Sequence, residues 1–103
     1  MLFLTHNMKQ FMEASMNVIM YGMHICPDCT EAMEVLKDHA DITVEYREFT
    51  QATTYLKEFL KYRDTNPLFN KVRFDGNIGI PLFVMENGSI TFDVYEVIYR
   101  NKR

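Results

Sequence analysis

Two cysteines separated by two residues constrain this chain more than any other feature of its sequence. Cys26 and Cys29 are its only cysteines, and they follow the short apolar run 18–21. The segment after Cys26 has the spacing of apolar and polar residues that is typical of a helix. A strand that leads into a helix through such a pair is typical of thiol–disulfide exchange. The sequence therefore predicts a redox-active dithiol at the start of a helix.

The position of each cysteine predicts a different role. A helix N-terminus directs unpaired N–H groups and the positive end of the helix dipole at Cys26, which favours its thiolate. Cys26 is therefore the candidate nucleophile, and Cys29, one turn further along, is the candidate resolving thiol. Pro27 suits the first helical position, because its missing N–H group and fixed φ cost nothing there.

Asp28 and His24 are expected to tune the acidity of Cys26 together with Pro27. The carboxylate of Asp28 disfavours a nearby thiolate, which would make the pair a better reductant. Asp28 would also stabilise the first turn of the helix. A protonated His24 would offset the charge of Asp28, although an exposed loop histidine is the simpler interpretation of that residue.

A Cys-x-x-Cys pair is also half of a zinc site, which needs four ligands. The chain has no second pair, and His6 and His39 do not stand at ligand spacing from the first. No metal site is therefore expected. A non-catalytic module that binds a metal through this pair, or that senses redox state with it, is the alternative to catalysis.

Length and composition favour one small domain with its own core. The 103 residues are 48% hydrophobic, and their formal net charge of −3 gives no reason to expect a nucleic-acid partner. No apolar run is long enough to span a membrane or to serve as a signal peptide. Two neighbouring cysteines without such a segment indicate the cytoplasm, where such pairs are more often catalytic than structural.

Hydrophobic periodicity predicts the order of the elements. Apolar residues on both faces indicate central strands, and alternation of apolar and polar residues indicates an edge strand at 42–47. Strands are expected at 17–21, 42–47, 80–85 and 89–92, and helices at 27–40, 51–63, 66–72 and after 93. Residues 1–16 are expected to be an N-terminal extension, helical over 7–15 or disordered, that precedes a domain at 17–103.

Several side chains are expected to mark the ends and faces of these elements. Thr50 would cap the helix at 51–63, and Asp93 with Glu96 would form a capping box. Asn87-Gly88 predicts a hairpin. Buried positions are expected at Phe69, Phe74, Ile90 and Phe92.

Cys26-Pro27-Asp28-Cys29 after a first strand, with Ile80-Pro81 at the start of a later strand, resembles the glutaredoxin branch of the thioredoxin superfamily. The resemblance covers roughly residues 17–100. It implies an α/β, thioredoxin-like (glutaredoxin-type) fold, a four-stranded mixed sheet with helices on both faces. It also implies that Pro81 is cis and lies against the cysteine pair. The backbone of Ile80 would then pair with the backbone of a bound substrate.

Three positions depart from that family. Met23 stands where a lysine usually helps to hold glutathione, Gly79 replaces the threonine before Ile80-Pro81, and only Asp93 is acidic after the hairpin. These departures argue against glutathione as the reductant, and no cofactor is expected. The expected function is the reduction of protein or small-molecule disulfides. A reductase or a low-molecular-weight thiol would recycle the pair, and neither nucleic acid nor membrane would be a partner.

Overall fold

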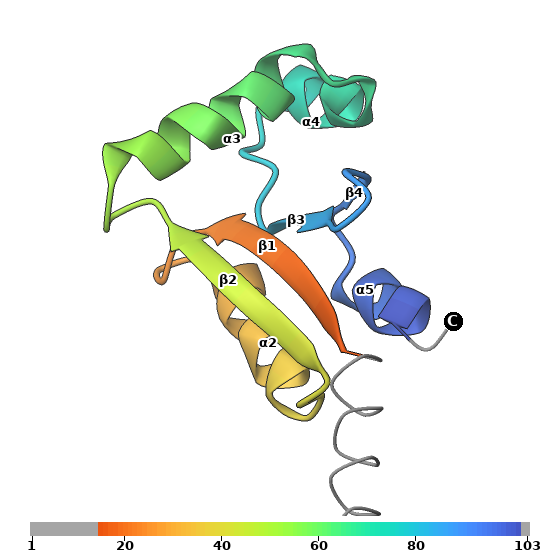
Figure 1. Cartoon of the computed structure of the whole chain (residues 1–103). Helices are drawn as coiled ribbons and strands as arrows, with labels where there is room; N and C mark the ends of the chain where they lie inside the picture. The colour runs from red at the N-terminus through yellow and green to blue at the C-terminus, as the bar shows by residue number, and fades with distance from the viewer. Residues whose placement is uncertain (1–14, 102–103) are drawn as a thin grey trace, which may run out of the picture.

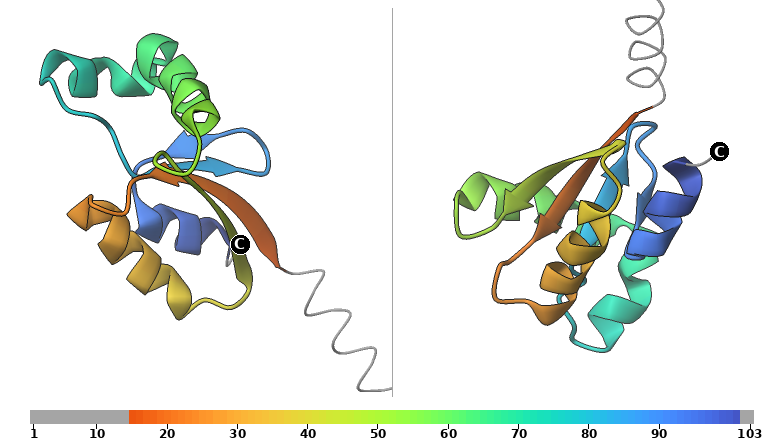
Figure 2. Two further views of the ribbon diagram at one scale, coloured as in Figure 1. Left: turned by 90° about the vertical axis from the view of Figure 1, so that its left-hand side faces the viewer. Right: turned by 90° about the horizontal axis from the view of Figure 1, so that it is seen from below.

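The computed structural model describes residues 15–101 as a mixed four-stranded sheet between two layers of helices (Figures 1 and 2). The strands are β1 (Met16–Gly22), β2 (Ile42–Glu48), β3 (Leu82–Met85) and β4 (Ile90–Thr91). The helices are α2 (Pro27–Lys37), α3 (Thr53–Thr65), the 3₁₀ turn η1 (Pro67–Phe69), α4 (Asn70–Phe74) and α5 (Val94–Asn101). The predicted α/β architecture is confirmed at this level. Residues 1–14 of the predicted extension lie outside the described residues.

Strand β1 lies inside the sheet, whose order is β2-β1-β3-β4. It is parallel to β2 along its whole length and antiparallel to β3. The predicted edge position of β2 is therefore confirmed. The parallel register pairs Gly22 with Glu48, so both strands end at the same place, directly before the cysteine loop.

The two faces of the sheet support separate hydrophobic clusters. Side chains of β1 and β3 alternate between the faces, as the pleat of a strand requires. Val18 and Met20 pack toward α2 and α5, whereas Tyr21 packs toward α3 and η1. Figure 2 shows α3 and α4 on one side of the sheet and α2 and α5 on the other. This arrangement confirms that β1 and β3 are apolar on both faces.

The expected cap of α3 and the expected end of α2 are wrong, and the helix expected at 66–72 is divided into η1 and α4. Helix α3 begins at Thr53 with Ala52 as its N-cap and without a side-chain cap. Thr50 is not the cap, because its hydroxyl and its backbone N–H both donate to the buried carboxylate of Glu48. Helix α2 ends at Lys37 rather than at 40, with Asp38 as its C-cap.

Phe69 is fully buried as expected, but the expectation for Phe74 is wrong, since its side chain is 90% exposed. Helix α4 has only five residues, and Phe74 is the last of them, so the chain turns away before another element covers it. Ile90 and Phe92 are half-buried, and the threonine between them is more deeply buried. Thr91 lies on the opposite face of the sheet, where its hydroxyl donates to the carboxylate of Glu96 at 2.7 Å.

The capping box is also only half formed. Asp93 caps α5 by accepting a hydrogen bond from the N–H of Tyr95 at 2.9 Å. Glu96 does not return to the backbone of Asp93, because Thr91 and Arg100 occupy its carboxylate. The N–H of Asp93 instead donates to the hydroxyl of Thr91 at 3.1 Å.

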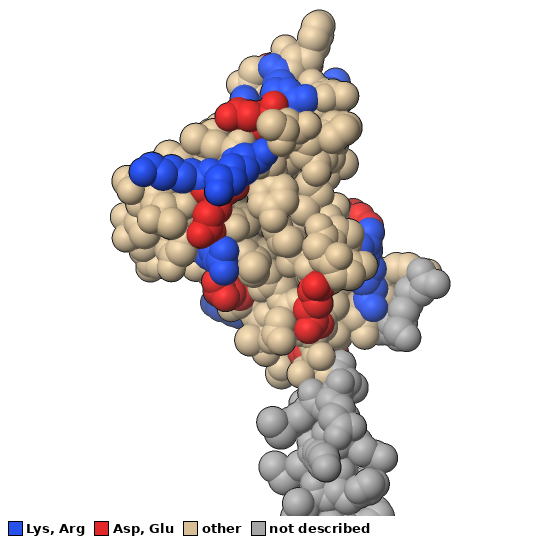
Figure 3. All heavy atoms as spheres, turned by 45° about the horizontal axis from the view of Figure 1, so that its top comes forward, with Lys and Arg blue, Asp and Glu red and all other residues tan. Residues whose placement is uncertain are grey.

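Charged side chains of both signs are interspersed on the face of the molecule in Figure 3. On the β2 edge, Arg47 pairs with Glu45 and with Glu58 of α3. Within residues 15–101, no helix is long and apolar enough to cross a bilayer.

Candidate functional site

Both cysteines lie at the N-terminal end of α2, directly after β1. A turn in which the N–H of Cys26 donates to the carbonyl of Met23 at 3.1 Å connects the two elements. Cys26 is the N-cap of the helix, with an extended backbone, and Pro27 occupies the first turn. The sulfur of Cys26 therefore lies among the free N–H groups at the helix start.

The two sulfurs are close together but differ in exposure. The Sγ atoms lie 3.0 Å apart, which is about 1 Å longer than a disulfide bond. Cys26 is partly exposed, whereas Cys29 has no exposed surface. The Sγ of Cys26 accepts a hydrogen bond from the N–H of Cys29 at 3.3 Å. A disulfide in solution can therefore contact the sulfur of Cys26 but not that of Cys29. The buried sulfur of Cys29 lies beside that of Cys26.

The surroundings of Cys29 keep it protonated in the reduced pair. Burial and the hydrogen bond with Cys26 raise the pKa of the Cys29 thiol to about 12, although a backbone hydrogen bond from Met23 opposes this shift. The nearby carboxylate of Asp28 raises it slightly further. Cys29 is therefore a poor nucleophile until the environment of its partner sulfur changes.

Gly22 and Tyr46 form the wall behind the buried sulfur. A Cβ atom added at Gly22 would lie 2.7 Å from the Sγ of Cys29 and 3.4 Å from the hydroxyl of Tyr46. Burial, followed by the charges of Cys29, Glu48 and Cys26, raises the pKa of Tyr46 to about 12. The sequence placed Gly22 in the turn that carries the site but did not predict its contact with Cys29, and it did not predict Tyr46 as part of the site. The only local signal was a glycine that ends an apolar strand just before the cysteine loop.

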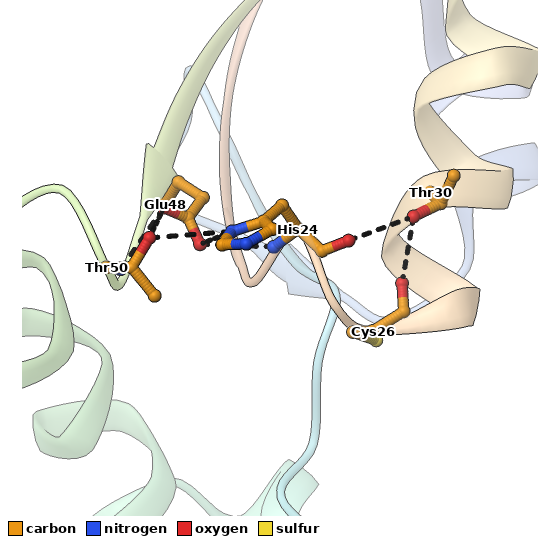
Figure 4. A network of polar contacts seen from close by, with 5 residues as sticks. All are labelled: His24, Cys26, Thr30, Glu48 and Thr50. Atoms are coloured by element: carbon orange, nitrogen blue, oxygen red, sulfur yellow. Dashed lines mark hydrogen bonds and ion pairs between the residues drawn. The ribbon is translucent and has the colours of Figure 1, made fainter.

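A buried carboxylate, Glu48, fixes the loop that carries the cysteines (Figure 4). Its Oε2 accepts hydrogen bonds from the N–H and the ring Nδ1 of His24, both at 3.1 Å. Burial alone would raise the pKa of Glu48, but the bonds from Thr50 and His24 outweigh it and hold the pKa at about 2. The loop is tied on its other side by the hydroxyl of Thr30, which donates to the carbonyls of His24 and Cys26.

The ring of His24 points toward Glu48 and Thr50, whereas Cys26 lies on the other side of the loop (Figure 4). The structure thus gives His24 a role in holding the loop that the sequence did not predict. Its expected influence on Cys26 stays a prediction. Glu48 itself was not predicted, because only the parallel register of β1 and β2 brings it to the loop.

A groove beside the exposed sulfur brings most of the predicted site residues together. We call it the thiol groove. It is lined by Met23, Ile25, Cys26, Pro27, Asp28, Val72, Gly76, Asn77, Ile78, Gly79 and Ile80. The segment 76–80 thus forms the wall opposite the cysteine loop. The peptide bond between Ile80 and Pro81 is cis, as the resemblance implied.

A second groove, which we call the acidic groove, continues from the first. It is lined by Asp28, Glu31, Ala32, Val35, Gly79, Ile80, Pro81, Phe92, Asp93, Val94 and Tyr95. Asp28, Gly79 and Ile80 belong to both grooves, and Pro81 lies in the second. No three metal-ligating side chains gather in the part of the chain that the structure describes.

Comparison with known proteins adds one sequence likeness. A protein of Haemophilus influenzae, called an uncharacterized protein, is 26% identical to this chain over 76 residues. These residues cover 74% of this chain and 87% of that protein. No protein-family profile and no solved structure matches the chain.

Proposed function

We propose that the protein is a thiol–disulfide oxidoreductase that reduces disulfides through Cys26 and Cys29. The observation that carries this proposal is the asymmetry of the pair. One sulfur is exposed at a helix N-terminus and the other is buried 3.0 Å behind it. Dithiol exchange needs this division, because one thiol must meet the substrate while the second is kept for the intermediate.

The exchange proceeds in two displacements that balance in atoms and electrons. The Cys26 thiolate attacks one sulfur of a substrate disulfide, forms a mixed disulfide and expels the other substrate sulfur as a thiolate. Cys29 loses its proton, attacks the Sγ of Cys26 and expels the remaining substrate thiolate. Two electrons pass from the pair to the substrate, and the Cys26–Cys29 disulfide remains. A reductase or a low-molecular-weight thiol of a reducing compartment such as the cytoplasm then supplies two electrons that reduce this disulfide again.

The topology supports the finer proposal of a thioredoxin-like fold of the glutaredoxin type. A parallel β1-α2-β2 unit is followed by an antiparallel β3-β4 hairpin and a last helix. The pair sits between the first strand and its helix, and a cis proline opens β3. In this proposal no cofactor takes part.

Intact-mass spectrometry of the reduced protein tests the function. After brief exposure to a neutral disulfide such as hydroxyethyl disulfide, the wild-type protein should lose two hydrogens. Cys29→Ser should stop at a stable adduct of one mercaptoethanol on Cys26. Cys26→Ser should form no adduct on this timescale, because the buried sulfur is out of reach.

A different result would favour another function for the pair. Cysteines that react only after a chelator is added would indicate a metal-binding module, and metal analysis of the purified protein would then identify the ion. Rapid oxidation without turnover in the presence of excess dithiothreitol and substrate would indicate a redox sensor.

A further inference from the structure

The thiol groove and the acidic groove form one trough that runs past the exposed sulfur of Cys26. They share Asp28, Gly79 and Ile80, so a bound segment can continue from one into the other. Figure 2 shows the start of α2 beside the segment that leads into β3. Residues of both segments line the two grooves. A trough that continues beyond the groove of the sulfur suits a polypeptide better than a compact disulfide.

The rim of the thiol groove is apolar where a substrate would approach. Ile25 on the cysteine loop is 71% exposed, and Ile78 on the opposite wall is 54% exposed. Large apolar side chains that stay exposed beside a reactive group indicate a surface that is covered when the partner binds. This half of the trough therefore suits an apolar side chain next to the substrate cysteine.

The wall that carries Ile78 is held in place. Gly79 has φ +94°, and a Cβ atom there would lie 2.6 Å from the ring of Phe69. The guanidinium of Arg63 donates to the carbonyls of Asn77 at 2.6 Å and Ile78 at 3.1 Å. This half of the trough is therefore largely formed before a substrate arrives.

The acidic groove carries three carboxylates above an apolar floor. Asp28, Glu31 and Asp93 line it, and none of its described lining residues is Lys, Arg or His. Asp93 uses one oxygen to cap α5, which leaves its negative charge in place. Arg63 is not among the residues that line this groove, and its guanidinium donates to carbonyls in the wall of the thiol groove. The field in this half of the trough is therefore negative, which favours a cation and repels a carboxylate.

We propose that the substrate is a protein disulfide in an extended segment that places an apolar side chain on one side of its cysteine and a Lys or Arg on the other. The apolar residue occupies the thiol groove between Ile25 and Ile78, and the cation occupies the acidic groove. The inference rests on the proposed function and adds the class of substrate. It also gives a physical reason why an anionic disulfide such as oxidised glutathione would be a poor substrate.

Matched peptide disulfides test this inference. Capped Leu-Cys-Lys, Leu-Cys-Glu and Ser-Cys-Lys peptides, in both side-chain orders, are joined to mercaptoethanol as mixed disulfides. Cys26 of the Cys29→Ser protein attacks either sulfur, and the other leaves as its thiolate. Mass spectrometry distinguishes the two adducts, so the rate at which the peptide adduct forms is the rate of peptide capture. Each rate is divided by the rate at which a small neutral thiol attacks the same mixed disulfide. This division removes the effect of peptide charge on the reactivity of the disulfide itself.

Electrostatic steering changes association rates by factors of about 10 to 10³ at low salt. We therefore expect Leu-Cys-Lys to be captured at least about tenfold faster than Leu-Cys-Glu in one of the two orders. The ratio should fall as ionic strength rises. Replacement of Leu by Ser in the peptide should slow capture severalfold, and Ile78→Ser should remove that difference.

Two variants on the same helix separate the groove from general charge. Glu31→Gln should at least halve the Lys-over-Glu ratio. Glu34→Gln removes the same charge from an exposed residue of α2 that is paired with Lys37 and lies outside both grooves, and it should leave the ratio unchanged. Equal rates for the Lys and Glu peptides, or equal effects of the two variants, would overturn the inference.

The neutral hydroxyethyl disulfide separates this inference from the proposed function. If Cys26 captures mercaptoethanol from it but shows no preference among the peptides, the oxidoreductase proposal stands and the substrate class is wrong. If Cys26 does not react with the neutral disulfide or any peptide, both proposals fail.

Discussion

Gly22 shows at the scale of one residue how closely the buried sulfur is packed. The position has no room for a side chain, because a Cβ atom would lie 2.7 Å from the Sγ of Cys29. Its neighbour across the sheet is Glu48, which holds the cysteine loop. Gly22 therefore connects two parts of the site, because it pairs with Glu48 across the sheet and contacts the sulfur of Cys29.

Gly22→Ala should lower the free energy of unfolding by about 1–3 kcal/mol, the usual cost of overpacking a core. Displacement of Cys29 should also slow closure of the internal disulfide after the mixed disulfide has formed. Chemical denaturation and quenched-flow mass spectrometry measure the two effects.

The same substitution in a Cys29→Ala background is the control, because the clashing sulfur is absent there. If Gly22→Ala costs as much in that background as in the wild type, the contact with the sulfur is not the cause.

The residues of the site that the sequence revealed are those with a local pattern. Cys26, Cys29 and Pro27 were predictable, because their spacing and their place at a helix start carry the signal. Glu48 and Tyr46 were not, because they reach the site only through the parallel register of β1 and β2. Nothing in their own segment distinguishes them from other residues of an edge strand.

At the scale of elements, the C-terminal end of α3 supports the wall of the thiol groove. Arg63 lies in the last turn of α3 and donates to two carbonyls of the segment before β3. This contact links the helix layer above the sheet to a segment that has no regular structure of its own. The position of the wall therefore depends on the position of α3.

Arg63→Gln should loosen that wall without unfolding the sheet. We expect backbone amides at 76–79 to exchange hydrogen at least several times faster, while amides of β1 and β3 keep their protection. Hydrogen-exchange mass spectrometry measures both regions. Capture of peptide disulfides should slow, whereas capture of hydroxyethyl disulfide should not.

Lys57→Gln supplies the matched control, since it removes a cation from an exposed position of the same helix. Similar exchange at 76–79 in both variants would mean that the carbonyl contacts of Arg63 do not hold the wall.

The elements themselves were largely predictable, because burial imposes a period of two on strands and of 3.6 on helices. β1, β2 and α3 follow these periods and were found within two residues of their ends. The exposure of Phe74 was not predictable in this way, because a five-residue helix is too short to show a period. The hydrogen bond from Thr91 to Glu96 was not predictable either, because composition does not reveal it.

For the whole molecule, three carboxylates make the free energy of unfolding depend on pH. The pKa of Glu48 is held at about 2, against an ordinary value of 4.5. Hydrogen bonds from Tyr21 and Arg47 lower the pKa of Glu58, and bonds from Thr91 and Arg100 lower that of Glu96. Each folded pKa is below its unfolded value, so the folded state binds fewer protons over this range. The stabilisation is therefore complete above about pH 4.5 and is lost as the pH falls toward 2.

We expect the free energy of unfolding to fall steadily between pH 5 and pH 3. Glu48→Gln should cost about 1.5–3 kcal/mol at pH 7, the range for hydrogen bonds to a charged group. It should also flatten the loss at low pH, because its side chain does not titrate. Urea denaturation at pH 7, 4.5 and 3 measures both effects.

Glu86→Gln removes the same charge from an exposed position in the hairpin turn and should leave the free energy of unfolding at pH 7 nearly unchanged. If the free energy of unfolding of Glu48→Gln falls with pH as steeply as that of the wild type, other groups cause the pH dependence.

The order of the strands also determines how this molecule behaves among its own copies. One border of the sheet is β2, where Glu45 and Arg47 place charge along the free backbone. The other border is β4, which is only two residues long. Charged and very short borders discourage a sheet from extending into a neighbouring chain. The fold can therefore keep its apolar β1 and β3 inside the sheet and still offer little template for aggregation at high concentration.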